Sequence, residues 1–268
     1  MHRTMTLAAF AAFAALALAG PARAAIKTEP VEYKQGDTTL QGFFAWDDAV
    51  KGKRPGVVVI HEWWGHNEHA RNQAKRLAKA GFVGFALDMY GKGKVTTHPE
   101  DAGAFMKEAS ADPATMKARF DAAVARLKEH PMVNGDEIGA VGYCFGGAVA
   151  LGMVDAGEDL DAVATFHGAM PKNPPPEGSK LKTHIFIATG GADPMVPPDQ
   201  AEAFAKQLRE AGADVHVTVY PKAKHGFTNP GADKVGMKGL GYDKEADTKS
   251  WQAAMKMFHQ VWKAPAKS

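Results

Sequence analysis

The stretch Gly142-Tyr143-Cys144-Phe145-Gly146-Gly147 decides the fold, because it lies between a short apolar strand pattern (138–141) and a helix pattern (145–154). A residue at the centre of such a tight turn adopts a strained conformation, so its neighbours two positions away must lack side chains. Gly142 and Gly146 meet this requirement, and Gly147 lets the helix pack closely on the sheet. The pattern predicts a nucleophile elbow centred on Cys144; the alternative is a small buried cysteine with no chemical role.

Apolar, β-branched runs alternate with amphipathic helical patterns along the rest of the chain. This alternation is typical of βαβ units around a mostly parallel sheet. Strands are expected at 57–60, 82–87, 138–141, 162–166, 185–188 and 215–220, and helices at 68–80, 112–129, 145–154, 201–211 and 245–262. Residues 39–46 alternate like an antiparallel edge strand. The predicted fold class is α/β, with a mainly parallel central sheet and helices on both faces.

The beginning of the chain has a composition of its own. Met1-His2-Arg3 is basic, residues 7–20 are almost purely apolar, and Ala22-Arg23-Ala24 supplies small residues around a cleavable position. This is the layout of a secretory signal peptide, and its apolar run is shorter than the ~20 residues that span a bilayer. We predict cleavage after Ala24 and a single domain over 25–268, exported to the periplasm or secreted.

Composition and charge exclude several classes of protein. The 268 residues are 45% hydrophobic and 23% charged, which is typical of a globular domain, and one cysteine cannot form an intramolecular disulfide. The 32 basic residues include two arginines within 1–24, where there is no acid, so 30 basic residues face 30 acidic ones in the remainder. This balance argues against nucleic-acid or membrane binding. The expected partner is a small molecule, bound by a monomer or small oligomer.

A thiol nucleophile needs a base, and the base needs an acid that orients it. In this architecture the chain order is nucleophile, acid, histidine, with the last two in loops after strands. Asp193 follows the strand at 185–188, and His225 follows the strand at 215–220, so both lie where ligands bind in open α/β sheets. We predict a Cys144–His225–Asp193 triad; the alternatives are a turn aspartate before Pro194 and an ordinary loop histidine.

The chain after residue 24 resembles the dienelactone hydrolase family of α/β-hydrolases over essentially its whole length. The resemblance rests on Val59-Ile60-His61-Glu62, Leu87-Asp88-Met89-Tyr90-Gly91, the Cys144 elbow, Asp193-Pro194 and His225-Gly226-Phe227. It implies the α/β-hydrolase fold and a triad that hydrolyses a carboxylic ester or lactone. It also implies that Glu62 holds the thiol in the resting state and releases or deprotonates it when substrate enters; the alternative is a solvated loop acid.

The oxyanion of the reaction is expected on two backbone N–H groups, those of Phe145 and Trp63, because the residues after the nucleophile and after the first buried strand donate in this fold. Candidate substrate-binding side chains are Lys92, Tyr90 and Trp64. No cofactor is expected. The His61–His69 stretch is rich in histidine but lacks the H-E-x-x-H spacing, so no metal is expected either.

The sequence departs from the family pattern where a substrate carboxylate would bind. Well-known members use two arginines, and the matching positions here are Lys92 and the neutral Asn229, which predicts a weaker clamp for anions. Asp88 is expected to be structural, bonding loop amides. The segment 229–242 is either a lid over the pocket or a plain surface loop.

A competing function is a thiol-based redox or ligand-binding protein on the same fold, with little turnover. The complete triad with Glu62 favours the hydrolase, because a sensor does not need Asp193 and His225 in catalytic order. The histidines outside the motifs are expected on the surface or in strands; they are His98, His130, His167, His184, His216 and His259.

Overall fold

The structure, a computed structural model, describes residues 25–171, 173 and 175–263. Its strands are β1 (Ile26–Gln35), β2 (Thr38–Asp47), β3 (Arg54–Ile60), β4 (Val83–Ala86), β5 (Val133–Tyr143), β6 (Ala162–Phe166), β7 (His184–Gly190) and β8 (Asp214–Tyr220). Its helices are α1 (Glu68–Lys79), α2 (Pro99–Ser110), α3 (Pro113–Lys128), α4 (Phe145–Asp155), α5 (Pro198–Glu210), the 3-10 helix η1 (Ala232–Val235) and α6 (Lys244–Trp262). The predicted signal peptide over 1–24 lies outside the described residues.

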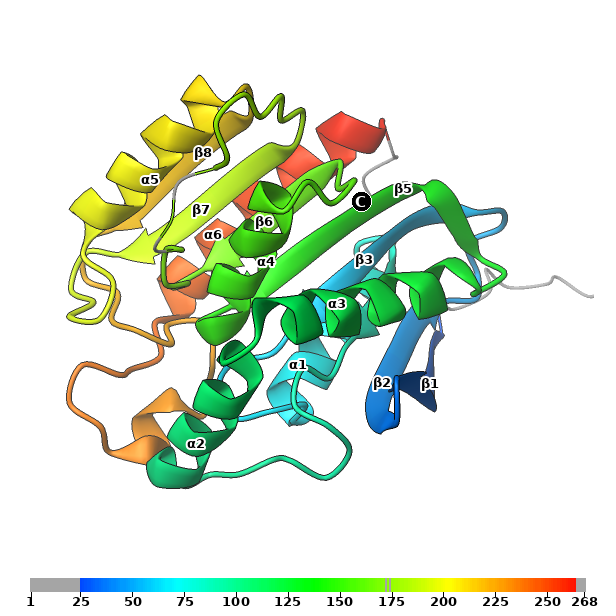
Figure 1. The fold of residues 1–268 in the computed structure, drawn as a ribbon, viewed down its shortest axis with the longest axis horizontal. Coiled ribbons are helices and arrows are strands. Elements are labelled where there is room, and N and C mark those ends of the chain that lie inside the picture. Colours follow the sequence, from blue (N-terminus) through cyan, green and yellow to red (C-terminus); the bar gives the residue numbers. More distant parts are fainter. Residues whose placement is uncertain (1–24, 172, 174, 264–268) are drawn as a thin grey trace, which may run out of the picture.

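The eight strands form one sheet in the order β1-β2-β4-β3-β5-β6-β7-β8 (Figure 1). Strands β3 to β8 run parallel, while β2 is antiparallel to both β1 and β4. All seven residues of β3 are buried, as expected for a parallel strand whose two faces are both covered. The predicted mainly parallel α/β sheet is confirmed.

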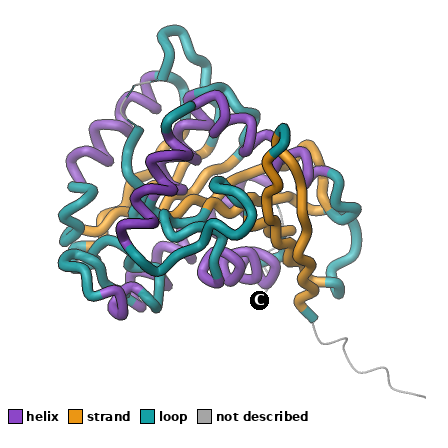
Figure 2. Tube along the Cα trace, turned by 60° about the horizontal axis from the view of Figure 1, so that its bottom comes forward, coloured by secondary structure: helices purple, strands orange, loops and turns teal. Residues whose placement is uncertain are grey.

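Helices cover both faces of the sheet, with the strands as a layer between them (Figure 2). On one face α1 and α6 contribute Leu77 and Phe258 to a fully buried apolar cluster. On the other face α3, α4 and α5 contribute a second cluster that includes Phe120 and Leu208. No helix within the described ranges is long and apolar enough to cross a membrane.

Two elements differ from the sequence-based expectation. The edge strand is β1, which was not predicted, so the expectation that 39–46 lies at the edge is wrong; the antiparallel direction of β2 is right. Strand β1 pairs with β2 along its whole length, and most of its side chains are exposed, so backbone pairing and a few packed side chains such as Tyr33 hold it in place. Helix α2 was also not predicted, because it buries only Ala102 and Ala109.

The parallel strands bring distant parts of the chain to one edge of the sheet. Strands that run parallel end at the same edge, and the loops there carry the groups that act on ligands. The turns and loops after β3, β5, β7 and β8 hold Glu62, Cys144, Asp193 and His225 respectively. The candidate functional site therefore lies at the carboxyl end of the sheet.

Candidate functional site

Cys144 occupies the turn between β5 and α4, in a backbone conformation with φ +53° and ψ −115°. A side chain in this region costs on the order of 1–3 kcal/mol and persists only where the surroundings enforce it. Two glycines make the turn possible. A Cβ at Gly142 would lie 2.1 Å from the carbonyl oxygen of Gly146, and a Cβ at Gly146 would lie 2.3 Å from that of Ile60. The local sequence therefore holds Cys144 half-buried at the start of α4.

His225 and Asp193 lie in line behind the thiol. His225 Nε2 is 3.0 Å from Cys144 Sγ, and His225 Nδ1 is 2.8 Å from Asp193 Oδ2. Both His225 and Asp193 are buried. Burial opposes a charge on the imidazole, but the negative charge of a Cys144 thiolate and the bond to Asp193 outweigh it and raise the pKa of His225 to about 10. The geometry brings the three predicted residues together, with the imidazole of His225 between the thiol and the carboxylate.

Backbone amides fix the carboxylate of Asp193. Its Oδ1 accepts hydrogen bonds from the N–H groups of Met195 at 2.8 Å and Val196 at 3.1 Å, which leaves Oδ2 for His225. Gly190, at the end of β7, lets this loop approach the loop after β8, because a Cβ there would lie 2.3 Å from the carbonyl oxygen of Ala223. The two loops are therefore packed against each other, with the acid facing the histidine.

The segment 229–242 supports the histidine from the other side. The N–H of His225 donates to the carbonyl of Gly239 at 3.0 Å, and its carbonyl accepts from the N–H of Gly241 at 3.1 Å. The segment thus returns to His225 and pairs with its backbone. The segment 229–242 therefore supports the histidine loop. This support is the same for the lid and the surface-loop interpretation of its outer part.

Glu62 is buried at the end of β3 and points to the loop that follows His225. Its Oε2 accepts a 2.6 Å hydrogen bond from the Asn229 side-chain amide. Burial raises the pKa of Glu62 to about 7, although the Asn229 hydrogen bond and the charge of His225 both act to lower it. Glu62 is therefore not a solvated loop acid, and near neutral pH it can take up or release a proton.

The two predicted oxyanion donors follow β5 and β3, at the same edge of the sheet as Cys144. Phe145 is the first residue of α4, so its N–H has no acceptor within the helix. The N–H of Trp63, in the turn after β3, donates to no group in the part of the chain that the structure describes. Both N–H groups are thus free to bind an oxyanion.

The predicted substrate-binding residues divide into two groups. Tyr90 and Trp64 are buried, and the ring of Tyr90 contacts that of Phe145 at a tilt of 37°, with centroids 5.5 Å apart. Burial raises the pKa of Tyr90, and its hydroxyl has no hydrogen-bond partner among the described residues. Lys92 instead forms a 2.6 Å ion pair with Glu32 of β1, and its side chain is half-exposed. Within the described residues no hydrogen bond or ion pair joins Lys92 to the triad.

Asp88 has the structural role expected from the sequence. Its Oδ1 accepts hydrogen bonds from the N–H groups of Tyr90 at 2.8 Å and Gly91 at 2.9 Å, and its Oδ2 accepts one from Gln41. The carboxylate therefore shapes the loop after β4. Nowhere within the described ranges are three or more His, Cys, Asp or Glu residues grouped so that they could hold a metal ion.

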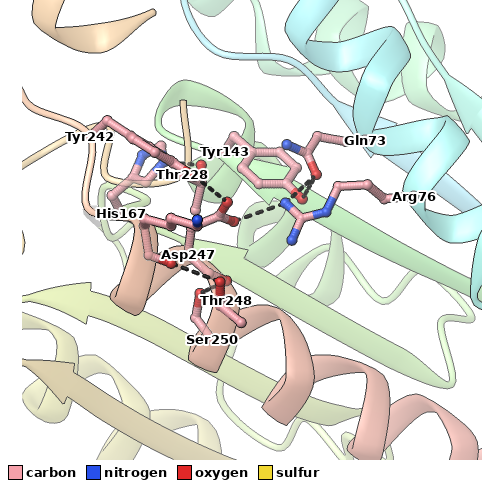
Figure 3. A network of polar contacts seen from close by, with 10 residues as sticks. Gln73, Arg76, Tyr143, His167, Thr228, Tyr242, Asp247, Thr248 and Ser250 are labelled. Carbon is pink, nitrogen blue, oxygen red and sulfur yellow. Dashed lines mark hydrogen bonds and ion pairs between the residues drawn. The ribbon is translucent and has the colours of Figure 1, made fainter. Parts of the chain in front are cut away.

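A polar network behind the elbow ties it to two helices (Figure 3). Tyr143, the residue before the nucleophile, donates its hydroxyl to Gln73 Oε1 of α1 at 3.1 Å. Arg76 of α1 donates to the same oxygen and to Asp247 Oδ1 of α6, at 3.1 and 2.8 Å. The strand that carries Cys144 is thus anchored to both helices on one face of the sheet.

Sequence reasoning missed two residues of this site. His167 was expected on the surface or in a strand, but it follows β6 and is fully buried, with its ring against that of His225. Asn229 was noted only as a neutral replacement, and its bond to Glu62 spans 167 positions in the chain. The available signal for His167 was its place directly after a buried strand at the catalytic edge.

Comparisons with known proteins agree with this architecture. The model of the dienelactone hydrolase family matches residues 40–262. Protein usf of Aquifex pyrophilus is 31% identical over 235 residues, 86% of this chain and 97% of that protein. A protein of Aquifex aeolicus (strain VF5), provisionally named carboxymethylenebutenolidase, is 30% identical over 233 residues, 85% of this chain and 96% of that protein.

A solved structure extends the likeness to three dimensions. The crystal structure of a dienelactone hydrolase-like promiscuous phosphotriesterase from metagenomic libraries has a TM-score of 0.83 and 34% sequence identity, and the match covers 89% of this chain and 99% of that one. The family and the fold predicted from the sequence are both confirmed. The chain belongs to the dienelactone hydrolase family and is a hydrolase with the α/β-hydrolase fold.

Proposed function

We propose that this chain is an exported hydrolase of carboxylic esters or lactones in which Cys144 is the nucleophile. The observation that carries the proposal is the line of contacts from Asp193 through His225 to the thiol, at 2.8 and 3.0 Å. Cys144 gives its thiol proton to His225 Nε2 and attacks the substrate carbonyl carbon through Sγ, and the N–H groups of Phe145 and Trp63 hold the oxyanion. Such donors are typically worth ~3 kcal/mol each in the transition state.

Release of the alcohol and hydrolysis of the thioester both use His225. The tetrahedral intermediate collapses, the carbon–oxygen bond breaks, and the leaving alcohol or enol takes a proton from His225 Nε2. His225 then removes a proton from water, whose oxygen attacks the thioester and expels the Cys144 thiolate. Asp193 keeps Nδ1 of the imidazole hydrogen-bonded throughout, so that Nε2 exchanges the protons.

We assign Glu62 to control of the thiol, because it is buried at the same edge of the sheet and its pKa of about 7 allows it to carry or give up a proton near neutrality. Substrate binding that disturbs the Glu62–Asn229 bond would free the carboxylate to assist the transfer of the thiol proton from Cys144 to His225. The two positions at which well-known members carry arginines hold a lysine paired with Glu32 and Asn229 here, so a dianionic lactone is a poorer substrate than an uncharged ester.

Trapping of the intermediate tests the assignment of the triad. His225→Ala should still form the thioester slowly but should fail to hydrolyse it. Intact-mass spectrometry after incubation with a short-chain ester should show one added acyl group on this variant, and none on Cys144→Ala. Multiple turnovers by His225→Ala at the wild-type rate would refute the role of the histidine.

Export is a separate part of the proposal and rests on the composition of residues 1–24. The full-length chain, expressed in a bacterium, should give exported protein whose first residue is Ala25. Edman sequencing of the periplasmic fraction measures this directly. Exported material that still begins at Met1 would overturn the predicted cleavage.

A further inference from the structure

His167 is a buried titratable residue that the proposed reaction does not use. It follows β6, is fully buried, and has a φ of +43°, a conformation that is uncommon for any residue other than glycine. Such a conformation persists only where the surroundings enforce it, and strained residues of this kind cluster at functional sites. His167 therefore combines a strained backbone, full burial and a place beside the candidate triad.

The ring of His167 lies directly against the candidate base. The rings of His167 and His225 meet edge-on, with centroids 5.2 Å apart at 65°, and Phe227 packs on His167 at the same centroid distance. His167 Nε2 is 2.8 Å from the hydroxyl of Thr228, which is buried in the loop that carries His225 (Figure 3). One side chain thus contacts three residues of the histidine loop.

The backbone around His167 is fixed to the other parts of the site. Its N–H donates to the carbonyl of Ala188 in β7, the strand that leads to Asp193, at 2.8 Å. A Cβ at the next residue, Gly168, would lie 2.8 Å from Cα of Gly147 in α4, so this turn is pressed against the first turn of the elbow helix. His167 is therefore held by the strand of the acid and by the helix of the nucleophile.

The surroundings of His167 also keep its imidazole uncharged. Burial lowers its pKa well below the ordinary value, and the charges of His225 and His69 act in the same direction. Among the described residues, the rings of Tyr143, His225 and Phe227 and the hydroxyl of Thr228 face its ring. The imidazole therefore stays neutral while His225 gains and loses protons, and it adds no competing positive charge.

We propose that His167 is a positioning residue for His225. Its ring and its bond to Thr228 hold the imidazole of His225 in the orientation that directs Nε2 at Cys144 Sγ. The inference rests on the proposed function, since it assigns His167 a role only through the base of that reaction.

Two substitutions separate this role from simple packing. His167→Phe keeps a ring but removes the hydrogen bond to Thr228, while His167→Asn removes the ring but suits a positive φ. His130→Phe is the matched control. His130 is also a buried histidine packed between aromatic rings, those of Phe44 and Trp46, but it lies just before β5, at the opposite end of that strand from Cys144.

The measurements are kcat/KM for a short-chain ester as a function of pH, and titration of the thiolate by its ultraviolet absorbance. Both His167 variants should lose about ten- to hundred-fold in kcat/KM at neutral pH, the cost of a misplaced catalytic group. Their thiolate titration should move to higher pH by about one pH unit, because a displaced imidazole stabilises the thiolate less. His130→Phe should change the melting temperature but neither readout.

Wild-type kcat/KM and an unchanged thiolate titration in both folded His167 variants would overturn the inference, as would the same shifts in His130→Phe. The failure of the proposed function is distinguishable, because it would appear as full activity of Cys144→Ala. An inactive Cys144→Ala beside wild-type-like His167 variants would remove only the role of His167.

Discussion

The side-chain amide of Asn229 donates a 2.6 Å hydrogen bond to the buried carboxyl group of Glu62, and its own oxygen accepts the N–H of Gly231 at 2.8 Å. Because both ends of the amide are engaged, its orientation is fixed. The bond joins the loop after His225 to the turn after β3, beside the candidate nucleophile. Burial raises the pKa of Glu62, and the bond from the neutral Asn229 amide offsets this less than a bond from a cation would.

Replacement of Asn229 by leucine removes the donor that stabilises the carboxylate. The pKa of Glu62, about 7 with the hydrogen bond in place, should then rise further. If the carboxylate form of Glu62 is the active one, the acidic limb of the kcat/KM profile moves to higher pH. Asn72→Leu on the exposed surface of α1 is the control. An acidic limb that stays in place in Asn229→Leu would contradict the role of this bond.

Glu62→Gln should change the pH dependence of stability. The pKa of Glu62 is about 7 in the folded chain and about 4.5 when unfolded, so between these values the folded chain binds more protons. Stability is then lost as the pH rises through this window, by on the order of 3 kcal/mol. The variant lacks this loss, so urea denaturation should show a higher free energy of unfolding than wild type at pH 8 and a similar one at pH 4. Equal differences at both pH values would rule out Glu62 as the source.

Gly142→Ala should disrupt the elbow. The added Cβ would lie 2.1 Å from the carbonyl oxygen of Gly146, a backbone atom that cannot move without displacing Cys144. We expect a loss of several kcal/mol of stability or no folded protein. Gly152→Ala in α4 is the matched control, because its Cβ meets nothing within 4 Å, and it should stabilise the helix by about 0.5–1 kcal/mol. Thermal melts of the two variants that move in the same direction would contradict this account.

The buried parallel strands and the loops that follow them could be predicted from the sequence, because stretches such as residues 57–60 of β3 are apolar throughout. Strand β1 could not, since most of its side chains are exposed and give no apolar pattern, and its place is set largely by backbone pairing with β2. Contacts within the site could not be predicted from the sequence either. The bond between Glu62 and Asn229, and the packing of His167 on His225, depend on how separate loops meet at one edge of the sheet.

The central claim is that Cys144 is the nucleophile, and kcat/KM of wild type and Cys144→Ala measures it most directly. Both proteins are assayed side by side on a short-chain chromogenic ester and on a dienelactone, with circular dichroism to show that the variant is folded. We expect the folded variant to lose at least about a thousand-fold in kcat/KM on every substrate that the wild type hydrolyses, and the wild type to be faster on the uncharged ester. A folded Cys144→Ala with wild-type kcat/KM would contradict it.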